Sequence, residues 1–119
     1  MIVVSDTTPL ISLLKINRID LLEKLFGEVM IPDAVFAELV ADKRFQSEAD
    51  LLLMDEAKGR NISAQIGLHF MGTIGVLMAA YEEQMLTSME VRECVNGLQR
   101  AGRHIGQRHY QALLDKLRD

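Results

Sequence analysis

Acidic residues follow two apolar segments of this sequence, and they are its best candidates for chemistry. The β-branched run at residues 1–5 ends at Asp6, and the apolar run at residues 51–54 ends at Asp55 and Glu56. Uninterrupted apolar runs of this length are typical of strands buried on both faces of a parallel sheet. Ligands of open α/β sheets bind beyond the carboxyl ends of the strands. We therefore expect Asp6 and Asp55 to project from the same edge of one sheet.

Two carboxylates at one sheet edge would favour a divalent cation. Like charges a few ångströms apart are tolerable only with water or a cation between them, and hard cations such as Mg²⁺ take oxygen ligands. A bound cation can activate water for attack on a phosphodiester and offset charge on the leaving oxygen. Two other interpretations stay open. Asp6 and Thr7 could only cap the following helix, or the two acids could be unrelated surface residues.

The residues around Asp6 predict a strand, a helical crossover and a second strand over residues 2–31. Thr8 and Pro9 indicate the N-cap and the first residue of a helix. Apolar residues recur at helical spacing, with a break at residues 17–20 and an end at Gly27. The second strand should pair in parallel with the first, because a helical crossover joins them.

The remaining chain continues the alternation of strands and helices. Glu38 lies near the apolar face of a predicted third helix, where it could lean over the end of the sheet. We expect the elements in this order: a helix opening at Pro32, a polar connection at 42–50, a strand at 51–54, a helix at 62–66, a strand at 68–71, a helix with Thr73 as its N-cap, and amphipathic helices over 85–119 divided near 102–106.

The composition predicts one folded domain over residues 1–119. Hydrophobic residues make up 49% and charged residues 25%, which is typical of a folded chain rather than a disordered one. No apolar run approaches the ~20 residues that span a bilayer, and the start of the chain has no pattern of a cleavable leader. We expect a cytoplasmic protein with no membrane contact.

The net charge of −4 argues against a broad basic face for nucleic acid. The charge is uneven, however, because residues 100–119 hold five lysines and arginines against two acids. This basic end could contact phosphates or could be only the solvated face of a terminal helix. The single cysteine, Cys94, lies in a helical pattern and is expected to be a packed thiol rather than a nucleophile.

Four segments together resemble the PIN-domain family. They are Val3-Val4-Ser5-Asp6-Thr7-Thr8-Pro9, residues 27–39 with Ile31-Pro32-Asp33-Ala34-Val35 and Glu38, residues 51–67 with Met54-Asp55-Glu56, and Gly72-Thr73-Ile74-Gly75. PIN domains are metal-dependent ribonucleases, and many are the toxin halves of bacterial and archaeal toxin-antitoxin pairs. The resemblance implies an α/β fold, with a PIN-like open parallel sheet flanked by helices in a single domain.

By this resemblance the chain is a metal-dependent endoribonuclease and the toxin component of a toxin-antitoxin pair. Asp6, Glu38 and Asp55 would be its catalytic acids. Asp6, Asp55 and Glu56 would bind Mg²⁺ or Mn²⁺, and Thr7 matches the hydroxyl residue that follows the first acid. RNA would be the substrate, and an antitoxin protein would be a partner.

The chain departs from the family between its second and third strands. Family members carry further helices there, which supply another acid, whereas this chain has only residues 43–50. Glu48 is the sole candidate for that acid. We therefore expect a fold truncated in this region, and a catalytically inactive module that binds protein or RNA is the alternative function. Missing helices would also uncover apolar surface, so we expect a homodimer.

Overall fold

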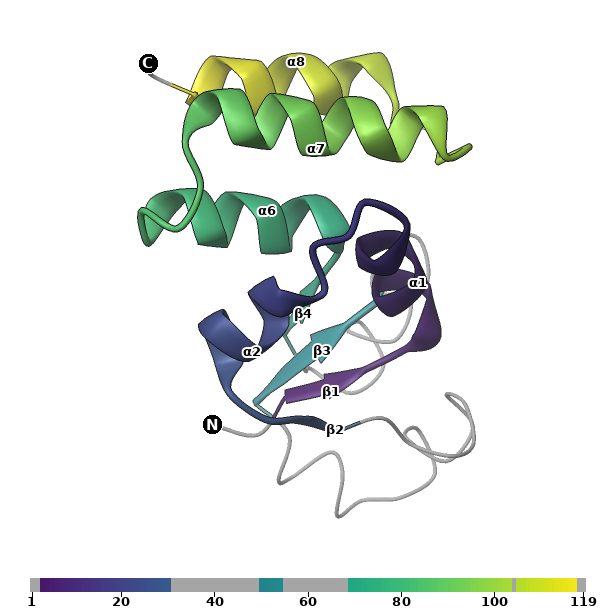
Figure 1. Cartoon of the computed structure of the whole chain (residues 1–119), viewed down its shortest axis with the longest axis vertical. Helices are drawn as coiled ribbons and strands as arrows, with labels where there is room; N and C mark the ends of the chain where they lie inside the picture. The colour runs from purple at the N-terminus through teal and green to yellow at the C-terminus, as the bar shows by residue number, and fades with distance from the viewer. Residues whose placement is uncertain (1–2, 31–49, 55–68, 104, 118–119) are drawn as a thin grey trace.

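The computed structural model describes residues 3–30, 50–54, 69–103 and 105–117. The described residues combine parallel strands with helices, as expected for an α/β protein (Figure 1). The described elements are β1 (Val3–Ser5), α1 (Thr7–Lys15), α2 (Asp20–Phe26), β2 (Val29–Met30), β3 (Leu51–Leu53), β4 (Phe70–Met71), α6 (Thr73–Glu82), α7 (Ser88–Arg100) and α8 (Gln107–Lys116).

The described strands form a parallel sheet with the order β2-β1-β3-β4. Val3 of β1 pairs with Val29 of β2 on one side and with Leu51 of β3 on the other. The predicted parallel pairing of the first two strands is therefore confirmed. The strand before Asp6 is also adjacent and parallel to the strand that leads to Asp55.

Both faces of the central strands are buried, as their apolar runs predict. Val3 and Leu53 belong to the core that the described helices share. Val4, Leu52 and Met54 alternate with them and therefore lie on the opposite face of the sheet. All five side chains have no exposed surface.

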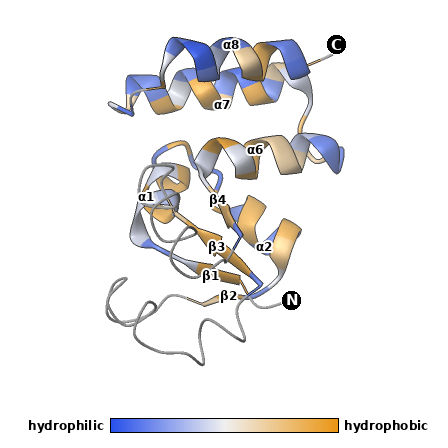
Figure 2. Ribbon diagram, turned by 180° about the vertical axis from the view of Figure 1, so that it is seen from behind, coloured by the Kyte–Doolittle hydropathy of each residue, from blue (hydrophilic) through white to orange (hydrophobic). Residues whose placement is uncertain are grey.

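The described helices form two layers beyond one face of the sheet (Figure 1). Helices α1, α2 and α6 pack next to the sheet, and α7 and α8 form a hairpin on the far side of α6. Figure 2 shows hydrophobic strands and a hairpin of mixed hydropathy, in agreement with the predicted amphipathic helices. The inner face of the hairpin contributes buried Val91, Val95, Leu98 and Leu113 to the core.

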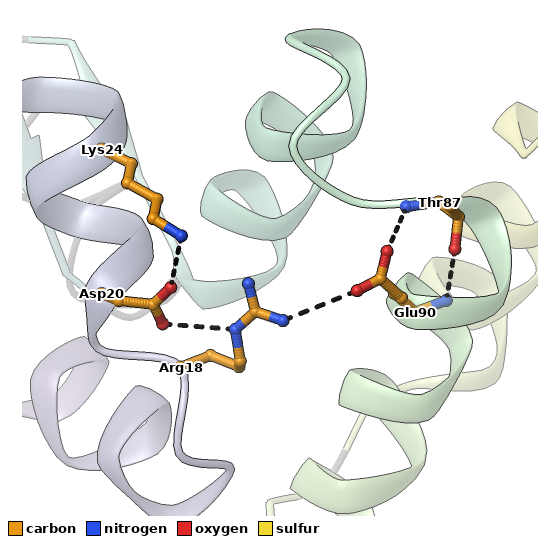
Figure 3. A network of polar contacts seen from close by, with 5 residues as sticks. All are labelled: Arg18, Asp20, Lys24, Thr87 and Glu90. Atoms are coloured by element: carbon orange, nitrogen blue, oxygen red, sulfur yellow. Dashed lines mark hydrogen bonds and ion pairs between the residues drawn. The ribbon is translucent and has the colours of Figure 1, made fainter.

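A polar network joins the α1–α2 turn to the start of α7 (Figure 3). The Arg18 Nε lies 3.2 Å from Asp20 Oδ1, and an Arg18 Nη atom lies 3.8 Å from Glu90 Oε2. Lys24 Nζ contacts the other oxygen of Asp20 at 3.1 Å. Glu90 also accepts a hydrogen bond from the Thr87 backbone N–H, while the Thr87 hydroxyl accepts one from the Glu90 N–H. This capping box begins α7 and ties it to the sheet-side helices.

Both acids of this network favour their ionised forms. The hydrogen bond from the Thr87 N–H lowers the pKa of Glu90, and the charge of Arg18 adds to the effect. Burial by itself would raise the pKa of Asp20, but the hydrogen bond from Lys24 and the charge of Arg18 outweigh it and hold the pKa below its usual value. The network is therefore most favourable when both carboxylates are charged.

Two predicted helix starts were wrong by one or two residues. Helix α1 begins at Thr7 with Asp6 at the N-cap position, so Thr8 is not the cap and Pro9 is the third helical residue. Helix α6 begins at Thr73, with Gly72 at the N-cap position. Each helix starts this early because only one residue separates it from the preceding strand, and that residue keeps an extended backbone. Pro9 is tolerated because first-turn N–H groups have no helical acceptor.

The predicted breaks elsewhere are confirmed. Asn17, between α1 and α2, and Gly27, at the end of α2, both have positive φ angles. Helix α7 ends at Arg100 and α8 begins at Gln107, in agreement with the predicted division near 102–106. No described helix is long and apolar enough to cross a membrane. The predicted helices at 32–40 and 62–66, and the truncation at 43–50, lie outside the described residues.

Candidate functional site at the carboxyl edge of the sheet

Asp6 lies where β1 ends and α1 begins. Its backbone N–H donates a hydrogen bond of 2.8 Å to the Leu53 carbonyl at the end of β3. Strand β1 therefore ends beside β3, and Asp6 stands at the carboxyl edge that the sequence predicted for it. The hydroxyl of buried Ser5 donates a bond of 2.8 Å to the Asp6 carbonyl, which further ties down the backbone at this point.

The carboxylate of Asp6 does not act as a helix cap. Asp6 occupies the N-cap position of α1, but its side chain makes no capping hydrogen bond within the described chain. Its Oδ2 atom is buried and has no hydrogen-bond partner among the described residues. A buried carboxylate oxygen without a partner is unfavourable, because its lost hydration is not replaced. The capping interpretation of Asp6 therefore does not account for this side chain.

The carboxyl end of β3 lies between those of β1 and β4. The Met54 N–H, just after β3, donates a hydrogen bond of 3.0 Å to Met71 at the end of β4. The Met54 carbonyl in turn lies 3.5 Å from the position that a Cβ on Gly72 would take. Helices α1 and α6 thus both begin at this edge, and the positive ends of their dipoles favour anionic groups there.

The other predicted site residues are placed as follows. Thr7 is the first residue of α1 and is exposed. Asp55, Glu56, Glu38 and Glu48 lie outside the described residues, although Asp55 directly follows buried Met54 in the chain. Within the described ranges, no three acidic, histidine or cysteine side chains gather into a possible metal site. The described part of the edge thus contributes one carboxylate, that of Asp6.

A divalent cation suits this carboxylate. Hard cations bind carboxylate oxygens, and Mg²⁺ commonly uses one or two carboxylates together with water and substrate phosphates. The unpartnered Oδ2 of Asp6 is an oxygen of this kind, held at a sheet edge by the backbone bond to Leu53. Asp6 therefore fits the role of a cation ligand.

An open groove of about 730 Å³ begins at the same edge and follows α8. Its walls come from α1 (Thr8 and Ser12), the start of α6 (Gly72 and Thr73) and the α7–α8 hairpin, including Arg103 and Lys116. We call it the hairpin groove. The sequence does not predict this groove, because it forms only where the hairpin packs against α1 and α6. The basic end of the sequence was the one signal that pointed to this region.

Cys94 is the packed thiol that the sequence predicts. It lies in α7 with 8% of its surface exposed, and burial raises the pKa of its thiol. A thiol that is hard to ionise is a poor nucleophile. Cys94 therefore contributes to packing rather than to chemistry.

Comparison with known families agrees with this geometry. A family model described as DUF3368, PIN domain, matches residues 2–50 and 43–119. The chain belongs to the PIN-domain family. The two matched segments of this PIN domain overlap at residues 43–50, where the sequence predicts a shortened connection. No curated protein and no solved structure matches the chain.

Membership of the family supports a nuclease function of the ribonuclease type. PIN domains generally use divalent metal ions. The parallel sheet, the flanking helices and the acid at the end of β1 are the features that this PIN domain shows in its described residues.

Proposed function

We propose that this PIN domain is a metal-dependent endoribonuclease. The observation that carries the proposal is the buried, unpartnered Oδ2 of Asp6 at the carboxyl edge of the sheet. An oxygen in this position is costly in an isolated fold and useful in a site that binds a cation. It is the arrangement expected of a ligand-binding residue rather than of a residue that only stabilises the fold.

The position of each acid in the chain suggests its proposed role. Asp6 and Asp55 follow adjacent parallel strands, and Glu56 is next in the chain, so these three are the proposed ligands of Mg²⁺ or Mn²⁺. Glu38 is the third proposed catalytic acid, and exposed Thr7 is available to a substrate phosphate. A divalent cation would supply Lewis-acid activation of water and of the phosphodiester. The N-termini of α1 and α6 add a favourable field for the anionic substrate.

The biological setting is part of the same proposal. We propose a cytoplasmic toxin that cuts RNA and is held inactive by an antitoxin protein.

We also propose a homodimer, for which the exposed Ile11 and Leu14 of α1 supply apolar surface. Light scattering at micromolar concentration should give twice the monomer mass, and a monomer mass would contradict the dimer.

The experiment that tests the function is cleavage of a mixed RNA pool. Wild-type protein should cleave RNA with Mg²⁺ or Mn²⁺ and not with EDTA. Asp6→Asn should lower the rate by ~100-fold or more, the order expected for loss of one group that stabilises charge in the transition state. Asp115→Asn is the matched control, because Asp115 is exposed on α8 and does not line the hairpin groove.

The alternative is a catalytically inactive module that binds RNA or protein. It predicts RNA that stays intact with every metal, and equal behaviour of wild type and Asp6→Asn. Metal-dependent cleavage that Asp6→Asn leaves unchanged would mean a contaminating nuclease and would also contradict the proposed site.

A further inference from the structure

We propose that the hairpin groove binds a single-stranded segment of the RNA substrate next to the cleavage site. This inference rests on the proposed nuclease function and adds a substrate-binding surface outside the acidic edge. It assigns a role to the α7–α8 hairpin, which the catalytic proposal does not use.

The first support is the position of the groove. Thr8, in its wall, is two residues after Asp6 in the first turn of α1. Gly72, also in its wall, lies beside the Met54 carbonyl, which precedes Asp55. The groove thus has residues of the carboxyl edge in its wall at one side and residues of the α7–α8 hairpin at the other. A strand bound at Asp6 would continue into it.

The second support is the charge of the groove. Arg103, His109 and Lys116 line it, and no acidic residue is among the described residues that do so. Neither Arg103 nor Lys116 forms an ion pair with another described residue. In a chain with a net charge of −4, the two cations Arg103 and Lys116 make this groove complementary to an anionic ligand.

The third support is Arg103 itself. Its Nε is a buried donor without a partner among the described residues, although the Arg103 backbone N–H is bonded to the Leu98 carbonyl. A buried donor without an acceptor is unfavourable, because its lost hydration is not replaced, and a ligand that binds the guanidinium can supply an acceptor. Phosphate oxygens match the planar guanidinium better than any other common biological acceptor except carboxylates. Arg103 is therefore the proposed phosphate contact at the turn of the hairpin.

The shape of the groove favours a polymer over a small molecule. Along α8, His109, Leu113 and Lys116 share one helix face that lines the groove. Helix α8 covers residues 107–116, which corresponds to ~15 Å at 1.5 Å per residue. Cations therefore stand at both ends of an extended surface. Partly buried Ile74 and Met78 of α6 also line the groove and offer apolar surface against which unstacked bases can pack.

The test measures binding without cleavage. The full chain carrying Asp6→Asn is titrated, in EDTA, with a short fluorescein-labelled single-stranded RNA, and anisotropy is recorded at several salt concentrations. Arg103→Gln or Lys116→Gln, added to this chain, should weaken binding ~5-fold or more and reduce the slope of log K against log salt by ~0.7 per contact. Arg108→Gln is the matched control, because Arg108 is exposed on α8 and does not line the groove. It should change the affinity less than twofold.

The outcomes separate this inference from the proposed function. Equal affinities and salt slopes for all variants would overturn it, even if wild-type protein cleaves RNA. Binding that depends on Arg103 and Lys116 supports it, even if no cleavage is found. Lys116 is exposed, so Lys116→Gln remains informative if Arg103→Gln fails to fold in a thermal melt. A fluorescein-labelled poly-glutamate peptide is titrated against the same variants. If Arg103→Gln and Lys116→Gln weaken binding of this peptide but leave RNA binding unchanged, the groove binds a protein and the RNA assignment is overturned.

Discussion

The backbone N–H of Asp6 donates a 2.8 Å hydrogen bond to the carbonyl of Leu53, two residues before Asp55. Through this bond Asp6 is the last residue before α1 that is hydrogen-bonded to β3. It brings a polar side chain from the start of the sequence beside a strand nearly fifty residues later. It also leaves the Asp6 carboxylate beyond the strand ends, where its buried Oδ2 has no described partner.

The first prediction concerns the stability of the Asp6 site. Without metal, Asp6→Asn should raise the melting temperature, because it removes the charge from a carboxylate with one buried, unpartnered oxygen while keeping the shape of the side chain. Mn²⁺ at about ten times its dissociation constant should stabilise only the wild type, by ~1.4 kcal/mol. Thermal melts of both proteins in EDTA and in Mn²⁺ measure the two effects. Four equal melting points would end the cation-site hypothesis.

The second prediction concerns acid and the Arg18 network. The folded pKa values of Glu90 and Asp20 are lowered, so folding favours their charged forms. Their contribution to stability is complete above the unfolded pKa values, which are near 4, and it is lost as the pH falls through the lower folded values. Urea unfolding at pH 7 and pH 3 should show this loss in the wild type.

Glu90→Gln is the informative variant for this network. Glutamine can still complete a capping box with Thr87, but it carries no charge for Arg18. The difference in unfolding free energy between the two pH values should therefore be smaller for Glu90→Gln than for the wild type. An equal difference would show that Glu90 does not contribute to the acid sensitivity.

The third prediction concerns the contact of α7 with the end of α1. A Cβ on Gly97 would lie 3.1 Å from Ile16 Cγ2, so a large side chain requires Ile16 or the helices to move. Gly97→Leu should lower the unfolding free energy by roughly 1–3 kcal/mol through overpacking. Asn96→Leu is the control, because Asn96 is exposed on the same helix. A neutral Gly97→Leu would mean that α7 can shift away from α1 freely.

The fourth prediction concerns Cys94. Because burial raises the pKa of this thiol, it should react with a disulfide reagent far more slowly in the native protein than in urea. Absorbance of the released thiolate measures both rates. A native rate close to the rate in urea would contradict the buried position of Cys94.

Local patterns in the sequence determine much of the architecture. The apolar runs before Asp6 and Asp55 indicated buried parallel strands, and Gly27 marked the end of α2. These features follow from backbone preferences and from the repeat of apolar residues, both of which act over a few residues. The acid at the end of β1 and the resemblance to the PIN family are also visible in short sequence patterns.

Other features depend on contacts between distant segments and were decided only by the tertiary structure. The start of α1 at Thr7, rather than after Thr8, follows from the bond between Asp6 and Leu53. The unpartnered Oδ2 of Asp6 depends on which atoms the packing brings near it. The hairpin groove and the position of Arg103 in its wall require the α7–α8 hairpin to pack against α1 and α6. Such contacts join residues that are tens of positions apart or more, and the spacing of residues along one segment carries no information about them.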